Sequence, residues 1–360
     1  MENNPKIMLH LIMPNQISGP NNAAKLIFNS WLNKKYEFGF LTQNFHAGGK
    51  ISFSLIKSLK KQIDSFNPDI IHLSGLQASG FHAVVAARLA KKKKIIIAVR
   101  GSSTDVLNSH WFKKFIFGWI IEPVTLKLAS HVYTVSKAMV KKRMIKKFSE
   151  NFIGTIHNSA PEINANSIEP VYFRKKNNID TSKILVAIVG RMVYDKGITF
   201  IIEAIKSFSP NHFSFVFIGD GPLISEMKKK LEGEIKEGRV FLLGHQKNVL
   251  PILAECDVFL FATLHENLSN ALLEACSLGL IPIVTNVGGN PEVIKHKENG
   301  ILVTPKDSKS IIDALKFINN NPKIASELSA NAKKTVDSEF SQKKLLQHVD
   351  DLYQKLLVSN

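Results

Sequence analysis

Short runs of apolar, largely β-branched residues alternate along the chain with longer stretches in which apolar residues recur every three or four positions. The short runs predict strands at 6–12, 38–42, 70–74, 95–100, 131–136, 152–158, 184–190, 213–219, 239–244, 257–262 and 281–286. The longer stretches predict helices, among them 20–32, 77–92, 197–208, 222–232 and 341–357. Because the short runs are apolar throughout, both faces of each strand are expected to be buried. Such strand–helix–strand repetition predicts an α/β protein with parallel sheets.

A polar segment at 158–183, rich in Asn, Ser and Pro, interrupts this alternation and separates two sets of elements of similar size. We therefore expect two doubly wound α/β domains, 1–170 and 171–340, whose sheets face each other across a cleft. The remaining stretch, 341–360, is expected to form a C-terminal helix that packs back on the first domain.

The sequence has no apolar run that approaches the ~18 residues needed to span a bilayer. Its first residues lack the basic start and apolar core of a signal peptide. A cytoplasmic location is therefore expected. The two cysteines, Cys256 and Cys276, lie within apolar runs and are expected to be buried free thiols.

Positive charge is concentrated in the first half of the chain. Residues 1–180 hold 26 Lys and Arg against 10 Asp and Glu, a net charge of +16, whereas residues 181–360 hold 21 against 20, a net charge of +1. Single lysine runs are also typical of solvated helix ends. An excess over a whole domain indicates a polyanionic partner, such as nucleic acid, anionic lipid or a phosphorylated substrate.

The loops that follow the strands hold the candidate binding residues, because open α/β sheets bind ligands at the carboxyl ends of their strands. In "GRMVYDKG" (190–197), Arg191 directly follows a strand and Lys196 stands at the start of the next helix. Two cations beside a helix N-terminus suit a diphosphate, although an exposed basic loop has the same pattern. The stretch "GDGPLI" (219–224) lacks the third glycine of GxGxxG, which disfavours a dinucleotide dehydrogenase.

Two glutamates, Glu266 and Glu274, lie eight positions apart in "HENLSNALLEA" (265–275), one before a predicted helix and one within it. An ionised glutamate only accepts hydrogen bonds, so it suits the paired hydroxyls of a sugar. Glu274 lies in an apolar pattern where an unpaired charge is costly, and it therefore requires a partner such as a ribose diol. The alternative is a helix-terminal charge together with an ordinary salt bridge.

These motifs, in this order, resemble those of a family 4 glycosyltransferase of the retaining, group 1 type. The stretches that carry the resemblance are 189–205, 217–223, 241–263 and 266–307, with looser matches at 69–90, 129–139 and 156–161. The interval from Glu266 to Glu274 resembles the E-x7-E motif of that family. The resemblance implies a GT-B fold of two Rossmann-like domains, with a nucleotide-sugar donor bound by the second and a glycan acceptor by the first.

By this resemblance, Arg191 and Lys196 bind the diphosphate, Glu274 binds the ribose and Glu266 binds a hydroxyl of the donor sugar near the reaction centre. The implied catalytic residues are Glu266, Arg191, Lys196 and Arg100. The implied donor-binding residues are Gly19, Gly190, Arg191, Lys196, Gly219, Gly221, His245, Glu266, Asn267, Leu268, Ser269, Asn270 and Glu274.

Two positions depart from the family pattern, and both lie in the first half. The N-terminal loop reads "SGPNN" (18–22) instead of a glycine pair, which puts its phosphate contacts in doubt. Arg100 stands before Gly101 where many members have histidine, so a histidine role is not transferred. An arginine can stabilise the charge of a leaving phosphate, but it cannot act as a general base at neutral pH.

The chain contains no D-x-D motif, so neither a metal nor another cofactor is expected, and the nucleotide-sugar is a substrate. A UDP-sugar is favoured as donor, and the family's usual mechanism is same-face attack assisted by the departing phosphate. The basic first half favours a lipid-linked glycan acceptor and a peripheral position on the anionic inner face of the plasma membrane, as in cell-surface polysaccharide biosynthesis. Lys113 and Lys114, beside Trp111, Phe112, Phe115 and Phe117, are candidate contacts with lipid headgroups, unless these aromatics belong to the core.

Three other functions are compatible with parts of these observations. A sugar-nucleotide epimerase and a glycogen-synthase-like transferase share the implied fold. A nucleic-acid-binding protein would account for the basic half, but the chain lacks a recognition motif and interleaved stacking aromatics. No nucleic-acid partner is therefore expected.

Overall fold

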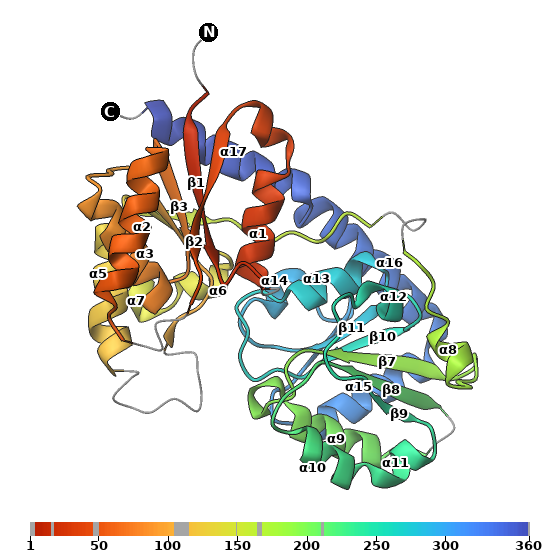
Figure 1. The fold of residues 1–360 in the computed structure, drawn as a ribbon. Coiled ribbons are helices and arrows are strands. Elements are labelled where there is room, and N and C mark those ends of the chain that lie inside the picture. The colour runs from red at the N-terminus through yellow and green to blue at the C-terminus, as the bar shows by residue number, and fades with distance from the viewer. Residues whose placement is uncertain are drawn as a thin grey trace. The chain divides into compact units, whose positions relative to one another are not determined.

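The computed structural model describes residues 4–15, 18–45, 50–103, 115–148, 150–163, 168–209 and 212–358. The chain forms two compact α/β units (Figure 1). Unit 1 comprises residues 1–158 and 343–360, and unit 2 comprises residues 159–342. The domain boundaries expected from the sequence were 170 and 340. Within the described ranges, every helix is too short or too polar to cross a bilayer.

Unit 1 is built on a six-stranded sheet in which all neighbouring strands are parallel, as the apolar runs predict. The spatial order is β2-β1-β3-β4-β5-β6. Every residue of β3 and β4 is buried, which explains why these runs are apolar throughout. The strand bounds are β1 (Lys6–Ile12), β2 (Glu37–Gln43), β3 (Ile70–Ser74), β4 (Ile95–Val99), β5 (His131–Thr134) and β6 (Phe152–Thr155).

Helices cover both faces of this sheet (Figure 1). On one face lie α1 (Gly19–Phe28) and the C-terminal α17 (Gln342–Val358), with η1 (Trp31–Lys34) beside them. On the other lie α2 (Phe53–Phe66), α3 (Ala78–Leu89), α5 (Glu122–Leu128) and α7 (Arg143–Phe148). The apolar stretch 115–121 includes a π-helical turn, η3 (Phe117–Ile121), and a short α6 (Lys137–Val140) follows β5.

Unit 2 contains a second parallel six-stranded sheet with the order β12-β11-β10-β7-β8-β9. Numbered within the unit, this is the strand order of a Rossmann fold, and its direction of winding reverses between β7 and β10. The strand bounds are β7 (Ile184–Val189), β8 (Phe213–Ile218), β9 (Val240–Leu242), β10 (Val258–Phe261), β11 (Ile281–Thr285) and β12 (Ile301–Val303). The expected α/β fold with two parallel, doubly wound sheets is confirmed.

The two faces of this sheet are covered by different sets of helices (Figure 1). On one face, α9 (Ile198–Lys206) packs against α15 (Ser308–Asn320), with α10 (Ile224–Lys230) and α11 (Glu232–Lys236) nearby. On the other, α13 (Asn270–Ser277) packs against α16 (Pro322–Glu339), with α12 (Leu250–Leu253) and α14 (Asn290–Val293) nearby. Cys256 and Cys276 are buried and unpaired, as expected.

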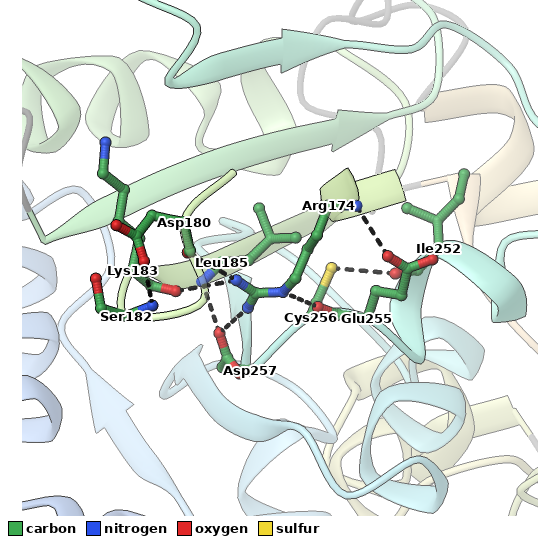
Figure 2. Close-up of polar contacts among 9 residues, drawn as sticks. All are labelled: Arg174, Asp180, Ser182, Lys183, Leu185, Ile252, Glu255, Cys256 and Asp257. Carbon is green, nitrogen blue, oxygen red and sulfur yellow. Dashed lines mark hydrogen bonds and ion pairs between the residues drawn. The ribbon is translucent and has the colours of Figure 1, made fainter. Parts of the chain in front are cut away.

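An arginine in α8 (Phe173–Lys176) fastens the start of unit 2 to the amino ends of β7 and β10 (Figure 2). The Glu255 carboxylate accepts hydrogen bonds from the amides of Phe173 and Arg174, both at 2.8 Å. The Arg174 guanidinium donates to the carbonyl of Glu255 at 2.8 Å and pairs with Asp257. Asp257 also accepts from the amide of Leu185 at 2.7 Å. These bonds fix the relative positions of the two strands that meet at the reversal of winding.

Candidate functional site

The carboxyl ends of β7 and β10 form the edge of the unit 2 sheet at which the candidate site lies. Their connections run to opposite sides of the sheet, which leaves a crevice between the two loops, the usual ligand site of an open α/β sheet. A small recess at this point is lined by Gly190, Arg191, Lys196 and Phe261, among others. The recess therefore lies between the loop 190–197 and the carboxyl end of β10.

Lys196 is held in this recess by the backbone around it. It ends a short 3-10 turn, η5 (Tyr194–Lys196), and Gly197 follows in the left-handed conformation with φ 69°. A Cβ atom on Gly197 would lie 2.0 Å from the carbonyl oxygen of Ala262, so only glycine fits there. The carbonyl of Asp195 accepts a hydrogen bond from the amide of Leu264 at 2.8 Å. The turn that presents Lys196 is thus attached to the residues that follow β10.

Lys196 and Glu266 form an ion pair across the two loops. The Nζ atom of Lys196 lies 2.8 Å from Oε2 of Glu266, and the two side chains are only 20% and 18% exposed. The other carboxylate oxygen, Oε1, accepts a hydrogen bond from the amide of Asn267 at 3.1 Å. The ammonium also lies 4.8 Å from the ring centroid of Phe261, a cation–π contact. Partial burial protects this pair from screening by salt.

The backbone of Glu266 is in turn fixed by the loop that follows β11. Gly288 has φ 54°, and a Cβ atom there would lie 1.6 Å from the carbonyl oxygen of Glu266. The close approach therefore requires glycine at this position. On the other side, Ser269 caps α13, because its Oγ accepts from the amide of Leu272 at 3.2 Å. Leu268 and Ser269 are buried, and Asn270 begins the helix. Glu266 thus lies between the close backbone approach of Gly288 and the capped start of α13.

Glu274 lies five residues beyond the cap of α13, about 7 Å along the helix. Its side chain is partly buried, and its carboxylate has no hydrogen-bond or ion-pair partner among the described residues. Burial raises the pKa of this carboxyl above its ordinary value, because the charged form loses hydration. An acid of this kind gains from a ligand that donates hydrogen bonds to it.

The remaining predicted donor-binding residues of unit 2 lie at the ends of neighbouring strands. Arg191 follows β7, is exposed, and forms no ion pair within the described part of the chain. Gly190 donates its amide to the carbonyl of Ile218 at 3.0 Å, and Gly219 donates to Gly244 at 2.8 Å. His245, just after Gly244, is exposed. Gly221 donates to its neighbour Asp220 at 2.7 Å.

Two predicted residues, Gly19 and Arg100, belong to unit 1. Gly19 is the first residue of α1, and Ser18 caps this helix. Arg100 follows β4, and burial lowers the pKa of its guanidinium. It donates to Oγ of Ser74 at 2.9 Å and to Oδ1 of Asn158 at 2.7 Å. Both residues lie at the carboxyl edge of the unit 1 sheet. Of the predicted lipid contacts, residues 111–114 lie outside the described part, and Phe115 is 51% exposed.

Sequence reasoning missed the residues that shape these sites without contributing charge. Phe261 lies inside an apolar strand, and its ring contact with Lys196 has no signal in the sequence. Gly197 belongs to the candidate loop 190–197, but only the structure shows which backbone segments approach Gly197 and Gly288. Asn158 is the last residue of the strand predicted at 152–158, whereas β6 ends at Thr155. Its place at the end of a strand was the available signal for its contact with Arg100.

Two family models match the chain. One, described as glycosyl transferases group 1, matches residues 172–335, and the other, described as glycosyltransferase family 4, matches residues 24–161. The protein is a family 4 glycosyltransferase.

Proteins similar to this glycosyltransferase are also named as glycosyltransferases. It is 26% identical over 322 residues to an Escherichia coli protein named UDP-Gal:alpha-D-GlcNAc-diphosphoundecaprenol alpha-1,3-galactosyltransferase, a match that covers 86% of this chain and 80% of the relative. It is 24% identical to the capsular polysaccharide biosynthesis glycosyltransferase CapM of Staphylococcus aureus, over 85% of this chain and 82% of the relative.

Solved structures show the same fold for this glycosyltransferase. Sucrose-phosphate synthase from Thermosynechococcus elongatus matches with a TM-score of 0.80 and 18% identity, over 99% of this chain and all of that one. The Anabaena protein HepE in complex with UDP-glucose matches with a TM-score of 0.77 and 16% identity, over 97% and 99% of the two chains. The predicted family, GT-B fold and enzyme class are confirmed. In the described ranges, no three His, Cys, Asp or Glu side chains gather as a metal site would require.

Proposed function

We propose that this glycosyltransferase moves a hexosyl or N-acetylhexosaminyl group from a UDP-sugar to a lipid-linked glycan, with retention of anomeric configuration and without a metal. The observation that carries the proposal is the Lys196–Glu266 pair at the reversal of winding in unit 2. The Lys196 ammonium suits the phosphates of a nucleotide-sugar, and the neighbouring Glu266 carboxylate can accept hydrogen bonds from the hydroxyls of its sugar. The names of the Escherichia coli relative and of the HepE complex support a UDP-linked donor.

In this reaction an acceptor hydroxyl oxygen bonds to the anomeric carbon of the donor sugar, while the bond from that carbon to the diphosphate breaks. The hydroxyl proton passes to the departing phosphate oxygen, and the nucleoside diphosphate leaves. Lys196 and Arg191 would stabilise the negative charge that grows on the phosphate during this step. Because both are cations at neutral pH, they can replace the metal that other transferases use for the same purpose.

At the two ends of the donor, the glutamates would have separate tasks. Glu266 would accept a hydrogen bond from a hydroxyl of the transferred sugar, and Glu274 would accept those of the ribose diol. The amides of Asn267, Leu268 and Ser269 would lie along the sugar and phosphate. The glycines Gly190, Gly219 and Gly221, with Asn270 and His245, would complete the donor site at the edge of the same sheet.

The acceptor would bind to unit 1. In the sheet order β2-β1-β3, the reversal of winding falls between β1 and β3, and the loop before Gly19 leaves β1 at this point. Arg100 stays protonated and would stabilise negative charge, in an orientation set by Ser74 and Asn158.

Charge supports a peripheral position on an anionic membrane surface, at the cytoplasmic face. Divided by the compact units, unit 1 holds 26 Lys and Arg against 9 Asp and Glu, a net charge of +17, while unit 2 holds 21 of each. Unit 1, which is proposed to bind the acceptor, therefore holds the entire excess of positive charge. The Escherichia coli relative, by its name, acts on a diphosphoundecaprenol glycan, a lipid-linked acceptor of the proposed kind.

The function can be tested by thermal-shift measurement with UDP-, GDP- and ADP-sugars, followed by transfer assays on lipid-diphosphate glycans. A ligand present at 100 times its dissociation constant should stabilise the protein by about 2.7 kcal/mol. We expect UDP-sugars to stabilise it and the glycosidic product to be the retained anomer by NMR. Stabilisation by none of the three nucleotide classes would reject the proposal. Conversion of the UDP-sugar into its epimer without transfer would favour an epimerase, and transfer to glycogen would favour a glycogen-synthase-like enzyme.

A further inference from the structure

The ion pair of Lys196 with Glu266 places a carboxylate next to the ammonium that is proposed to bind the diphosphate. Lys196 Nζ and Glu266 Oε2 pair with each other at 2.8 Å. In the proposed function the same two residues bind neighbouring parts of the donor, the diphosphate and the transferred sugar. Glu266 is the only described partner of the Lys196 ammonium apart from the face of the Phe261 ring. A diphosphate that approaches Lys196 must therefore enter beside a carboxylate that is 18% exposed.

We infer that Glu266 is a specificity-determining residue that discriminates against the nucleoside diphosphate product in favour of the sugar-bearing donor. The inference rests on the proposed function and adds a task to a residue already placed in the site. A bare diphosphate brings only negative charge and hydrogen-bond acceptors to Glu266, and it competes for Lys196. A nucleotide-sugar brings hydroxyl donors that satisfy the same carboxylate.

The difference between the two ligands is large because the pair is mostly shielded from water. Like charges within about 4–6 Å repel strongly where hydration is incomplete, and an unsatisfied buried carboxylate has a high free energy. Oε1 of Glu266 already accepts from the amide of Asn267, and the described partner of Oε2 is Lys196. When Lys196 pairs with a phosphate instead, a sugar hydroxyl can donate to Oε2 in its place, whereas a bare diphosphate offers no donor there.

The same exchange assists product release. Transfer removes the sugar from the site and leaves a diphosphate with more negative charge than the donor had. Glu266 then lacks its hydroxyl partner, and re-forming the 2.8 Å pair with Lys196 competes with the phosphate for the ammonium. We therefore expect weak product inhibition in the wild-type enzyme and strong product inhibition when the carboxylate is removed.

The test is calorimetric titration of wild type and Glu266→Gln with UDP and with UDP-glucose, UDP-galactose and UDP-N-acetylglucosamine. Glutamine keeps the length of the side chain and an acceptor for the amide of Asn267, but it removes the charge. We expect UDP to bind the variant about tenfold more tightly, or about 1.4 kcal/mol. The UDP-sugar that the wild type turns over should bind no more tightly than before. The inhibition constant for UDP should fall in parallel.

Two control variants separate a local effect from a general one. Glu266→Asp keeps the charge, and its affinity for UDP should stay within threefold of the wild type. Glu226→Gln removes a carboxylate from α10, where Glu226 pairs with Lys230 at 2.7 Å on the surface. This variant should leave both affinities within twofold.

The outcomes distinguish the inference from the function on which it rests. If the wild type binds and turns over a UDP-sugar, but Glu266→Gln changes the UDP to UDP-sugar affinity ratio by less than threefold, the inference is wrong and the function stands. An equal gain for both ligands, or the same gain in Glu226→Gln, also overturns it. If the wild type binds neither UDP nor any of the three sugars, the proposed function is wrong and the inference falls with it.

Discussion

Glu274 offers a sharp test of the donor site, because one substitution should move stability and binding in opposite directions. Its carboxylate is partly buried, has no described partner, and has a raised pKa caused by burial. Glu274→Gln replaces a poorly hydrated charge with a neutral amide of the same shape. We expect the free variant to be at least as stable as the wild type at neutral pH. We expect donor binding to be weaker, because the ribose hydroxyls lose a charged acceptor.

The magnitude follows from the hydrogen bonds that would be lost. A hydrogen bond to a charged group contributes about 1.5–3 kcal/mol, so the dissociation constant for UDP should rise about 10- to 150-fold. Glutamine retains one acceptor oxygen, so its effect should lie near the lower figure, and Glu274→Ala should lie near the upper one. Both variants should weaken UDP and the UDP-sugar equally, because the ribose is common to the two ligands.

The pH dependence has a definite sign. Because the folded-state pKa of Glu274 is raised, the free wild type should lose stability as pH rises from the ordinary value of 4.5 through the raised value. Glu274→Gln should lack this loss. Ribose hydroxyls favour the ionised form, so donor affinity should increase over the same window, with proton release on binding.

Calorimetric titration of UDP in buffers of different ionisation enthalpy, together with urea unfolding across this range, measures both effects. If Glu274→Ala binds UDP within twofold of the wild type while it stays folded, the ribose assignment is wrong.

Three further predictions concern other parts of the chain. Lys196→Ala should lower kcat on the order of 100-fold as well as raise KM, because charge grows on the phosphate in the transition state, and an unchanged kcat in steady-state assays would remove that role. Replacing Lys141, Lys146 and Lys147 with Glu should weaken co-sedimentation with anionic vesicles at low salt at least tenfold, since each surface lysine contributes about 1 kcal/mol; equal binding to neutral vesicles, or none to anionic ones, would contradict the membrane proposal. Arg174→Ala should lower the free energy of unfolding by about 2 kcal/mol in urea titrations through the loss of its bonds to charged groups, and a change below about 0.5 kcal/mol would show that these bonds are dispensable.

Local patterns predicted most of the strands, because a strand buried on both faces must be apolar at every position. Ile281–Thr285 is an example, and all five of its residues are buried. The pattern failed where an element is too short to show a period. The strand Ile301–Val303 has three residues, and its pairing with β11 defines it more than its composition does. Likewise, the apolar stretch 115–121 is too short for its pattern to distinguish an α-helical turn from the π-helical turn at Phe117–Ile121.

The sequence also predicted both members of the Lys196–Glu266 pair, but not that they meet. The two residues stand 70 positions apart, and each was assigned to a ligand by the chemistry of its own loop. Their contact depends on β10 lying beside β7, a strand order that no local pattern encodes. The prediction that the site lies at the carboxyl ends of the strands therefore came from the fold class alone. The distance between the two charges required the tertiary structure.

The final helix shows a similar limit, because its polar residues do not all face water. Periodicity predicted an amphipathic helix at 341–357, and α17 spans Gln342–Val358. Asp350 is nevertheless 1% exposed. It accepts hydrogen bonds from Nζ of Lys35 at 2.6 Å and from the hydroxyl of Tyr36 at 2.7 Å. The buried carboxylate is stable there because both of its oxygens have partners. Burial, and then the hydrogen bond to Asp350, raises the pKa of the Tyr36 hydroxyl.

One turn further along α17, Tyr353 fixes the register of the helix on unit 1. Its hydroxyl lies 2.7 Å from Nδ1 of His72, and Nε2 of the same ring lies 3.0 Å from the hydroxyl of Tyr133. Burial, with a smaller effect of the Arg100 charge, lowers the pKa of His72 to about 3, so the ring is neutral and has one donor and one acceptor. One tyrosine must therefore donate to the ring while the other accepts from it. A shift of α17 by one residue would remove the partner of Nδ1 of this buried histidine. The hydrogen bonds of Tyr353, and not only the apolar face of the helix, thus assign the end of the chain to unit 1.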